Sequence, residues 1–199
     1  QQNSGGVLQI AGQSFRNFTG DISATATGEI NINVPVRARS IKSLLWKTSE
    51  QTAQETFTLS QGSNMSLSQY QVKIGATNYP PTPVQVDAST NKIEPYLELE
   101  KAFGKLGSTI HDNMLTNQTY LGSRKGSGGK DSVSTFAPFG LDLESFRAEI
   151  ENGVDTSSRA LPMTLSLTLG TDGVFGQSTC FIYALIDTLF FVNMDGSVS

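Results

Sequence analysis

The sequence predicts an all-β protein: an antiparallel sandwich of about eight strands, with two short helices in the loops that cover the ends of the sheets. Apolar and polar residues alternate over residues 30–38 and again over 163–169, as expected for strands with one buried face. Nineteen glycines, only seven prolines and abundant serine and threonine are typical of strands joined by polar turns. A chain of 199 residues with 37% hydrophobic residues can bury its own core, so we expect a single domain over residues 1–199.

The N-terminal part of the chain predicts two strands. Residues 1–27 are polar and glycine-rich around an apolar island that ends at Ile10, which predicts one short edge strand after a loose terminus. Residues 30–38 place their apolar side chains on one face and predict a half-buried strand. Pro35 has no backbone N–H to donate, so this strand is expected at a sheet edge or bent at the proline.

Further strands are predicted in the middle of the chain. Residues 41–48, 56–60 and 69–75 are rich in strand-forming residues and are bounded by polar turn residues. Residues 78–87 contain three of the prolines, and the residue before a proline is pushed toward extended geometry. We therefore expect this segment to run extended and not to act as a central strand before Val84.

Two stretches, residues 93–106 and 141–153, have a helical period. Apolar residues recur at helical spacing in both: Tyr96, Leu99, Phe103 and Leu106 in the first, and Leu143, Phe146 and Ile150 in the second. Pro95 suits the first turn of one helix, and Gly153 suits the end of the other. Residues 120–134, between the two helices, are rich in glycine and serine and predict a mobile surface loop.

The last third of the chain returns to strand. Residues 163–169 alternate cleanly and predict a second half-buried strand. Residues 178–194 are apolar on both faces, which predicts a central strand or strand pair buried on both sides. Asp187 lies in the middle of this run and must reach solvent or accept hydrogen bonds, because an isolated buried carboxylate costs several kcal/mol.

The residue types needed for most catalytic and metal sites are scarce. The only histidine, His111, lies in a polar segment and is expected to be a solvated loop residue. The only cysteine, Cys180, lies in an apolar run and is expected to be a buried, inert thiol. Clustered histidine and cysteine ligands are therefore excluded by count, and we assign no catalytic, cofactor-binding or metal-binding residue and expect no cofactor.

Paired carboxylates are the one remaining enzymatic option, because some sandwich folds hydrolyse glycosides with two acids. The nearest pairs are Glu98 with Glu100 and Glu149 with Glu151. At a spacing of two on a helix the side chains point about 200° apart, so neither pair can face one bond. A phosphate-binding loop in residues 122–131 is also excluded, because the glycine and serine or threonine positions of that motif are occupied by Arg124 and Asp131.

Charge and hydropathy exclude two further classes. Fourteen Lys and Arg against eighteen Asp and Glu give a net charge of −4, which argues against a coat that neutralises nucleic acid directly. No stretch reaches about 18 uninterrupted apolar residues, and no signal peptide opens the chain, so no transmembrane segment is expected. The chain begins with Gln1 and not Met, which favours a proteolytic product or a fragment of a longer protein.

Several stretches together carry a resemblance to a known family. They are RARSIKSLLW, QYQVKIGATNYPPTPVQVD, YLELEKAFGKLG and FGLDLESFRAEIENGVDTSSRALPMTLSLTL, followed by the C-terminal apolar strand. Over residues 36–195 the chain resembles the C-terminal half of double jelly-roll viral major capsid proteins. This is the adenovirus hexon lineage, which includes the coats of virophages, polinton-like viruses and large DNA viruses.

The resemblance implies an eight-stranded antiparallel jelly-roll sandwich and a structural virion protein. Such a protein would assemble in the host cell, with copies of itself and other capsid subunits, into trimeric or pseudo-hexameric capsomers of an icosahedral capsid, without sequence-specific nucleic-acid binding. Family members carry two jelly rolls in one chain, so the other half is a separate chain, or this is a cleaved or single jelly-roll relative. The second apolar face of residues 178–194 is then covered either by the opposite sheet and the helices or by a neighbouring jelly roll.

Two other function classes stay open on sequence grounds. A carbohydrate-binding or glycan-hydrolysing sandwich domain is the first, although a sugar cleft usually offers several aromatic platforms and Trp46 is the only tryptophan. A viral spike or adhesin module is the second. Glycan binding and hydrolase activity would separate these classes from a capsid protein.

Overall fold

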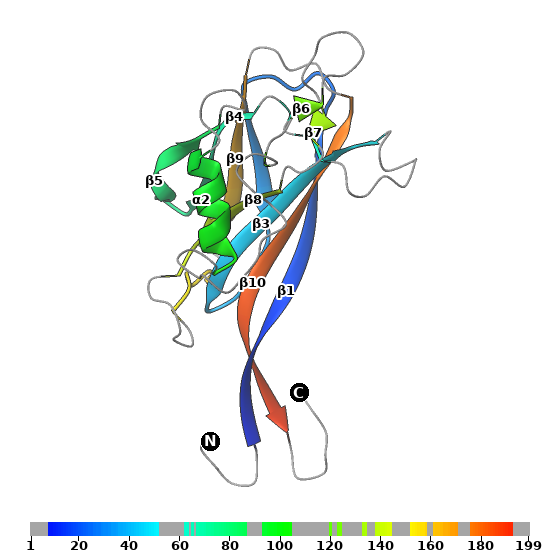
Figure 1. The fold of residues 1–199 in the computed structure, drawn as a ribbon. Helices are drawn as coiled ribbons and strands as arrows, with labels where there is room; N and C mark the ends of the chain where they lie inside the picture. The colour runs from blue at the N-terminus through cyan, green and yellow to red at the C-terminus, as the bar shows by residue number, and fades with distance from the viewer. Residues whose placement is uncertain are drawn as a thin grey trace.

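The computed structural model describes residues 8–51, 62–63, 65, 67–86, 93–104, 120, 123–124, 133–134, 138–144, 152–158, 161–170 and 176–192 (Figure 1). Most of these residues lie in strands that form two four-stranded sheets and one two-stranded sheet. The predicted strand at 56–60 lies outside the described residues.

The eight longer strands pair antiparallel within the two larger sheets. The first sheet has the order β1 (Leu8–Ile22), β10 (Ser178–Val192), β3 (Ile41–Glu50) and β8 (Pro138–Asp142). The second has the order β2 (Glu29–Val34), β9 (Met163–Leu169), β4 (Leu67–Ile74) and β5 (Thr77–Gln85). Helix α2 (Ile93–Ala102) follows β5, and the short strands β6 (Ser123–Arg124) and β7 (Val133–Ser134) pair with each other.

The strand pairing is nested along the chain. Strand β1 pairs with β10, β2 with β9, β3 with β8, and β4 with β5, as in one long antiparallel hairpin. The hairpin is rolled up so that β10 also pairs with β3, and β9 with β4. Eight strands connected in this way form a jelly roll, so the predicted fold class is confirmed.

The hydrophobic core lies between the two larger sheets. Its fully buried side chains come from both: Leu44, Trp46, Ile182 and Ala184 from the first, and Val34, Tyr70, Val72, Met163, Leu165 and Leu167 from the second. The alternating residues predicted within 30–38 and 163–169 therefore fill the core. Strand β2 lies at a sheet edge and ends before Pro35, and the proline-bearing β5 is the other edge strand of that sheet, as the sequence indicates.

Helix α2 packs on β8 where that strand has a glycine. A Cβ at Gly140 would lie 2.8 Å from Ala102 Cβ and 3.0 Å from Leu99 Cδ1, so any larger residue would push the helix away. The helix contacts β8, β3 and β5, and it covers the side of the sandwich where β8 and β5 are edge strands (Figure 1). The helix predicted over 93–106 ends at Ala102 in the structure. Phe103, which belongs to the predicted apolar period, follows the helix and is exposed.

Three predictions about strands and helices need correction. The second helical period, over 141–153, begins inside β8, where Leu141 pairs with Leu44 in the sheet, and residues 143–144 and 152–153 are not helical. Residues 145–151 lie outside the described residues. The short edge strand predicted at the N-terminus is the edge strand β1, but it has 15 residues. Its core-side positions include Gly12, Ser14 and Arg16, so no apolar alternation marks its length.

The third correction concerns β10. It is a central strand between β1 and β3, as predicted, but only one of its faces is buried along the sheet. That face carries Cys180, Ile182, Ala184 and Ile186, whereas Tyr183 on the opposite face is exposed. In the part of the chain that the structure describes, no helix is long and apolar enough to cross a membrane.

Candidate functional site

Strands β1 and β10 run on together past the end of the first sheet. They pair over 15 residues each, from Leu8 opposite Val192 to Ile22 opposite Ser178. Strand β3 pairs with β10 only as far as Ile186. Residues 8–13 and 187–192 therefore form a two-stranded extension, which we call the ribbon, and Figure 1 shows it projecting from the sandwich.

The ribbon exposes large apolar side chains on both faces. Those with the greatest exposed fractions are Leu8 at 40%, Ile10 at 47%, Leu189 at 42%, Phe190 at 38% and Phe191 at 36%. Because side chains alternate along a strand, Ile10 and Phe190 share the face that continues the core side, and Leu189 and Phe191 share the other. Phe190 lies over Gly12, where a Cβ would be 3.0 Å from its ring.

Such a surface is unusual on an isolated subunit. A two-stranded hairpin is at best marginally stable in water, and buried apolar surface is worth about 25 cal/mol per Å². Contiguous exposed apolar patches mark interaction sites in soluble proteins. The ribbon is therefore the strongest candidate for a functional surface among the described residues.

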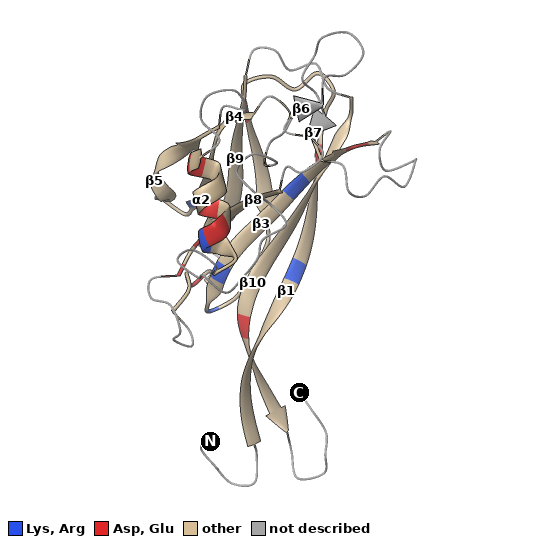
Figure 2. Cartoon of the chain, viewed as in Figure 1, with Lys and Arg blue, Asp and Glu red and all other residues tan. Residues whose placement is uncertain are grey.

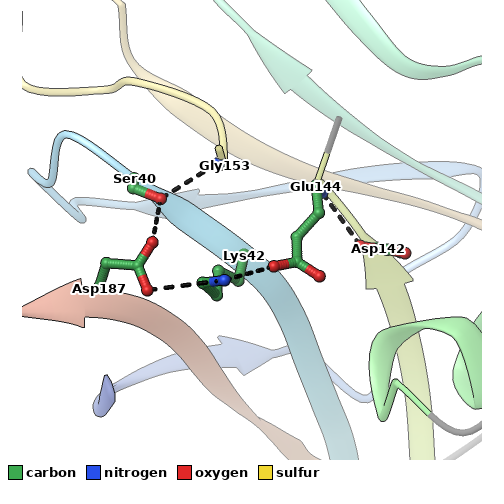
Figure 3. A network of polar contacts seen from close by, with 6 residues as sticks. All are labelled: Ser40, Lys42, Asp142, Glu144, Gly153 and Asp187. Atoms are coloured by element: carbon green, nitrogen blue, oxygen red, sulfur yellow. Dashed lines mark hydrogen bonds and ion pairs between the residues drawn. The ribbon is translucent and has the colours of Figure 1, made fainter. Parts of the chain in front are cut away.

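A buried polar network lies where the ribbon leaves the sheet (Figure 3). The Ser40 hydroxyl donates a 2.6 Å hydrogen bond to Asp187 Oδ2 and accepts one from the Gly153 N–H at 3.0 Å. Lys42 Nζ lies 2.6 Å from Glu144 Oε1 and 3.7 Å from Asp187 Oδ1. The Asp187 N–H also donates to the Ser40 carbonyl. We call Ser40, Lys42, Glu144 and Asp187 the root network.

The strand pairing explains how Lys42 enters this network. The β10–β3 register passes from Ser43 directly to Ile41, so Lys42 is the extra residue of a β-bulge. Its side chain is only 8% exposed, and that of Asp187 only 9%. Asp187 accepts hydrogen bonds, which is one of the two outcomes that the sequence predicts for it.

Electrostatics keep Lys42 charged in this position. Burial alone would lower the pKa of its ammonium group, but the hydrogen bond and charge of Glu144 and the charge of Asp187 outweigh burial and raise it. The root network therefore holds one cation between two acidic side chains. Through Asp187, the network links β10 to β3 and to the segment after β8, next to Ile186, where the pairing of β10 with β3 ends.

The outer face of the second sheet is polar. Glu29 Oε1 accepts hydrogen bonds from Lys73 Nζ at 2.6 Å and Ser166 Oγ at 2.7 Å, and mainly the Lys73 bond lowers the pKa of Glu29 to about 2. These residues line a shallow pocket of about 80 Å³. Pockets that bind drug-sized ligands are typically about 300–1,000 Å³, so this one is too small for such a site.

No protein-family model and no curated protein sequence matches this chain. Solved structures do. PBCV-1 VP54, fitted into a reconstruction of the virophage Sputnik, has a TM-score of 0.54 and 13% identity over 97% of this chain and 51% of that chain. A chain of the PBCV-1 virus capsid has a TM-score of 0.54 and 11% identity over the same shares. A chain of the Sputnik virophage has a TM-score of 0.51 and 9% identity over 98% of this chain and 38% of its own.

This chain has the fold of those viral chains. The resemblance to jelly-roll capsid proteins that the sequence predicts is thus confirmed for the fold. The chain spans about half the length of the two PBCV-1 chains and less of the Sputnik chain.

The jelly roll places the chemically reactive candidates apart from the ribbon surface. Cys180 is fully buried, and burial raises the pKa of its thiol to about 12, as expected for a buried thiol. Glu98 forms an ion pair with Lys101 on α2, and Glu100 is buried. His111, Glu149 and Glu151 lie outside the described residues. Among the described residues, no group of three His, Cys, Asp or Glu could hold a metal ion.

Trp46, the only tryptophan of the chain, packs with other aromatic rings inside the sandwich and offers no platform for a sugar. Trp46 is buried with its ring centroid 4.8 Å from that of Tyr70 and 5.8 Å from that of Phe139. Tyr120 is also fully buried, with its ring 6.3 Å from Phe139 and 5.6 Å from Tyr96. The sequence predicts Tyr120 within a surface loop, and for this residue the prediction is wrong. The glycine and serine residues that follow it gave no sign that it packs into the core.

Proposed function

We propose that this chain is a structural capsid protein of a virion. In this proposal residues 1–199 form one jelly-roll domain that assembles with copies of itself and with other capsid subunits. The product is a trimeric or pseudo-hexameric capsomer of an icosahedral shell, assembled in the host cell. The observation that supports this function most is the shared fold over 97% of the chain with a chain of the PBCV-1 capsid.

The length of this chain relative to the PBCV-1 chains is compatible with a role as one domain of such a capsomer. It covers 51% of the PBCV-1 chains, so a capsomer of similar size would need about twice as many copies of this domain, or a second domain from elsewhere. The exposed ribbon supplies apolar surface for contacts of this kind. The net charge of −4 favours contact with protein over direct contact with nucleic acid.

The proposal includes no catalysis and no cofactor. Glu144 and Asp187, the two acidic residues of the root network, both interact with Lys42. Glu29 interacts with Lys73 and Ser166. These contacts are explained by strand positioning and need no substrate. A function as a glycan-binding or glycan-hydrolysing domain, the alternative from the sequence, gains no support from the buried Trp46.

The oligomeric state of the purified full chain tests the proposal. We expect light scattering after size-exclusion chromatography to give discrete trimers or larger species, and negative-stain electron microscopy to show regular capsomers, sheets or shells. A chain that stays monomeric up to its solubility limit and binds or cleaves a glycan would contradict it.

A further inference from the structure

The ribbon needs a partner that provides two things. Its side chains are apolar on both faces, so the partner must offer apolar surface. Its edges are also open among the described residues, because β1 is an edge strand and no strand pairs with β10 on the β3 side after Asp187, whose N–H still donates to Ser40. An open edge presents backbone N–H and C=O groups that pair best with another strand.

The distribution of charge further limits which kind of surface can contact the ribbon. Apart from Asp187 at the root, no residue of the ribbon carries a charge. Figure 2 shows the projecting end of β1 and β10 in the colour of uncharged residues, whereas α2 carries both acidic and basic residues. The outer face of the second sheet carries Glu29, Lys73 and hydroxyl or amide side chains. Beyond Asp187 the ribbon is apolar and uncharged, so it would match another ribbon without desolvating a charge.

A lipid surface fits less well. Lipid would cover the apolar side chains, but it offers no hydrogen bonds to the backbone groups at the open strand edges. Backbone groups left without hydrogen bonds are costly inside a bilayer. A second ribbon offers apolar side chains and a β edge in the same segment. Contact between two identical surfaces is also the usual way in which identical subunits pair.

We infer that the ribbon of one copy packs against the ribbon of a second copy of this chain. This contact rests on the proposed function, of which it is one interface. It buries Leu189 and Phe191 on one face, or Ile10 and Phe190 on the other, against the same segment of the partner copy. The root network holds the ribbon at a fixed angle to each jelly roll and so sets the geometry of the pair.

Substitution of exposed residues tests the contact in the full chain. Leu189→Asp and Ile10→Asp place a carboxylate on opposite faces of the ribbon, and Ile93→Asp places one on α2, where Ile93 is 57% exposed. By sedimentation velocity we expect at least one ribbon variant to weaken self-association by about tenfold or more, because a carboxylate would be buried there without a partner. Ile93→Asp should associate like the wild type, and the melting temperatures of all variants should stay close together.

Cross-linking gives a second readout that does not depend on loss of stability. Because Cys180 is fully buried, a cysteine introduced at a surface position is the main reactive thiol. Ala11→Cys lies in the ribbon, and Asn33→Cys lies on the exposed outer face of the second sheet. A short bismaleimide should link copies of Ala11→Cys into dimers and leave Asn33→Cys monomeric.

The outcomes separate this inference from the proposed function. Assemblies that survive both ribbon substitutions, with no cross-link at Ala11→Cys, would overturn the ribbon contact and leave a capsid function standing. A wild type that forms no assembly, yet still cross-links at Ala11→Cys, would support the contact and count against the capsid. Binding of the wild type, but not of Leu189→Asp, to phosphatidylcholine vesicles without self-association would assign the ribbon to lipid and overturn the inference.

Discussion

At the scale of single residues, the polar groups inside this jelly roll act by fixing strands. The root network shows this most clearly, since Lys42 on β3 joins Asp187 on β10 to Glu144 after β8. Residue patterns predicted that Asp187 would need solvent or hydrogen bonds. They could not predict Lys42 as its partner, because the β-bulge that turns Lys42 toward Asp187 leaves no mark in the sequence.

Replacing Lys42 with Met should destabilise the fold strongly. The substitution leaves the nearly buried Asp187 and the partly buried Glu144 without their cation, and breaking a buried pair in this way costs about 3–5 kcal/mol. The matched control is Lys73→Met, which breaks the more exposed Lys73–Glu29 pair and should cost at most about 1 kcal/mol. Urea denaturation at neutral pH measures both. Equal losses in the two variants would contradict the role of the root network.

The raised pKa of Lys42 predicts a pH dependence of stability. The pKa of Lys42 is raised in the folded state above its ordinary value of 10.5, so its contribution is fully present below that pH. The contribution is lost as the pH rises through the folded-state value. The wild type should therefore lose more stability than Lys42→Met when denaturation is measured across the alkaline range, and parallel curves would argue against the raised pKa.

The thiol of Cys180 should be silent in the folded protein. Full burial raises its pKa to about 12, so almost no thiolate exists near pH 8 and the sulfur is out of reach of reagents. A chromogenic disulfide reagent should find no reactive thiol in the native protein and one per chain in denaturant. Rapid reaction under native conditions would show that β10 is not held in the core as described.

At the scale of elements, the predictions succeeded where one face of a strand is continuously apolar. Strand β9 and the start of β2 belong to this group, and their alternation identified both the strand and its buried face. Strand β1 was predicted too short because glycine, serine and arginine occupy its core side. The segment at 141–153 was predicted to be helical, yet pairing with β3 makes its first residues a strand. Long-range pairing decided both cases, and a local pattern does not contain it.

The contact between α2 and β8 gives an element-scale prediction. Gly140→Ala would place a Cβ 2.8 Å from Ala102 Cβ and 2.9 Å from Leu45 Cδ2, so the helix or the strand must shift. We expect a loss of about 1–3 kcal/mol in the free energy of unfolding. Gly176→Ala is the control, since nothing lies within 4 Å of its added Cβ. If thermal or urea denaturation gave the same small effect for both, the close packing of α2 on β8 would be wrong.

At the scale of the whole molecule, the nested strand pairing defines the jelly roll and the ribbon defines its unusual surface. The family resemblance pointed to the jelly roll, whereas residue periodicity alone reached only a sandwich. The ribbon was missed for a physical reason. An apolar run on both faces of 178–194 indicates double burial only if a second layer covers each face. The sequence reveals neither that the outer face of β10 is left exposed at Tyr183 nor that β3 stops pairing at Ile186. The candidate surface therefore became visible only in the structure.

Cryo-electron microscopy of the assembled full chain tests the central claim most directly, because it shows both whether jelly rolls form capsomers and what lies against each ribbon. The account predicts ordered trimeric or pseudo-hexameric particles in which the β1–β10 ribbon of one copy contacts the ribbon of another. Particles that contain only isolated sandwiches, with solvent on both faces of the ribbon, would contradict it.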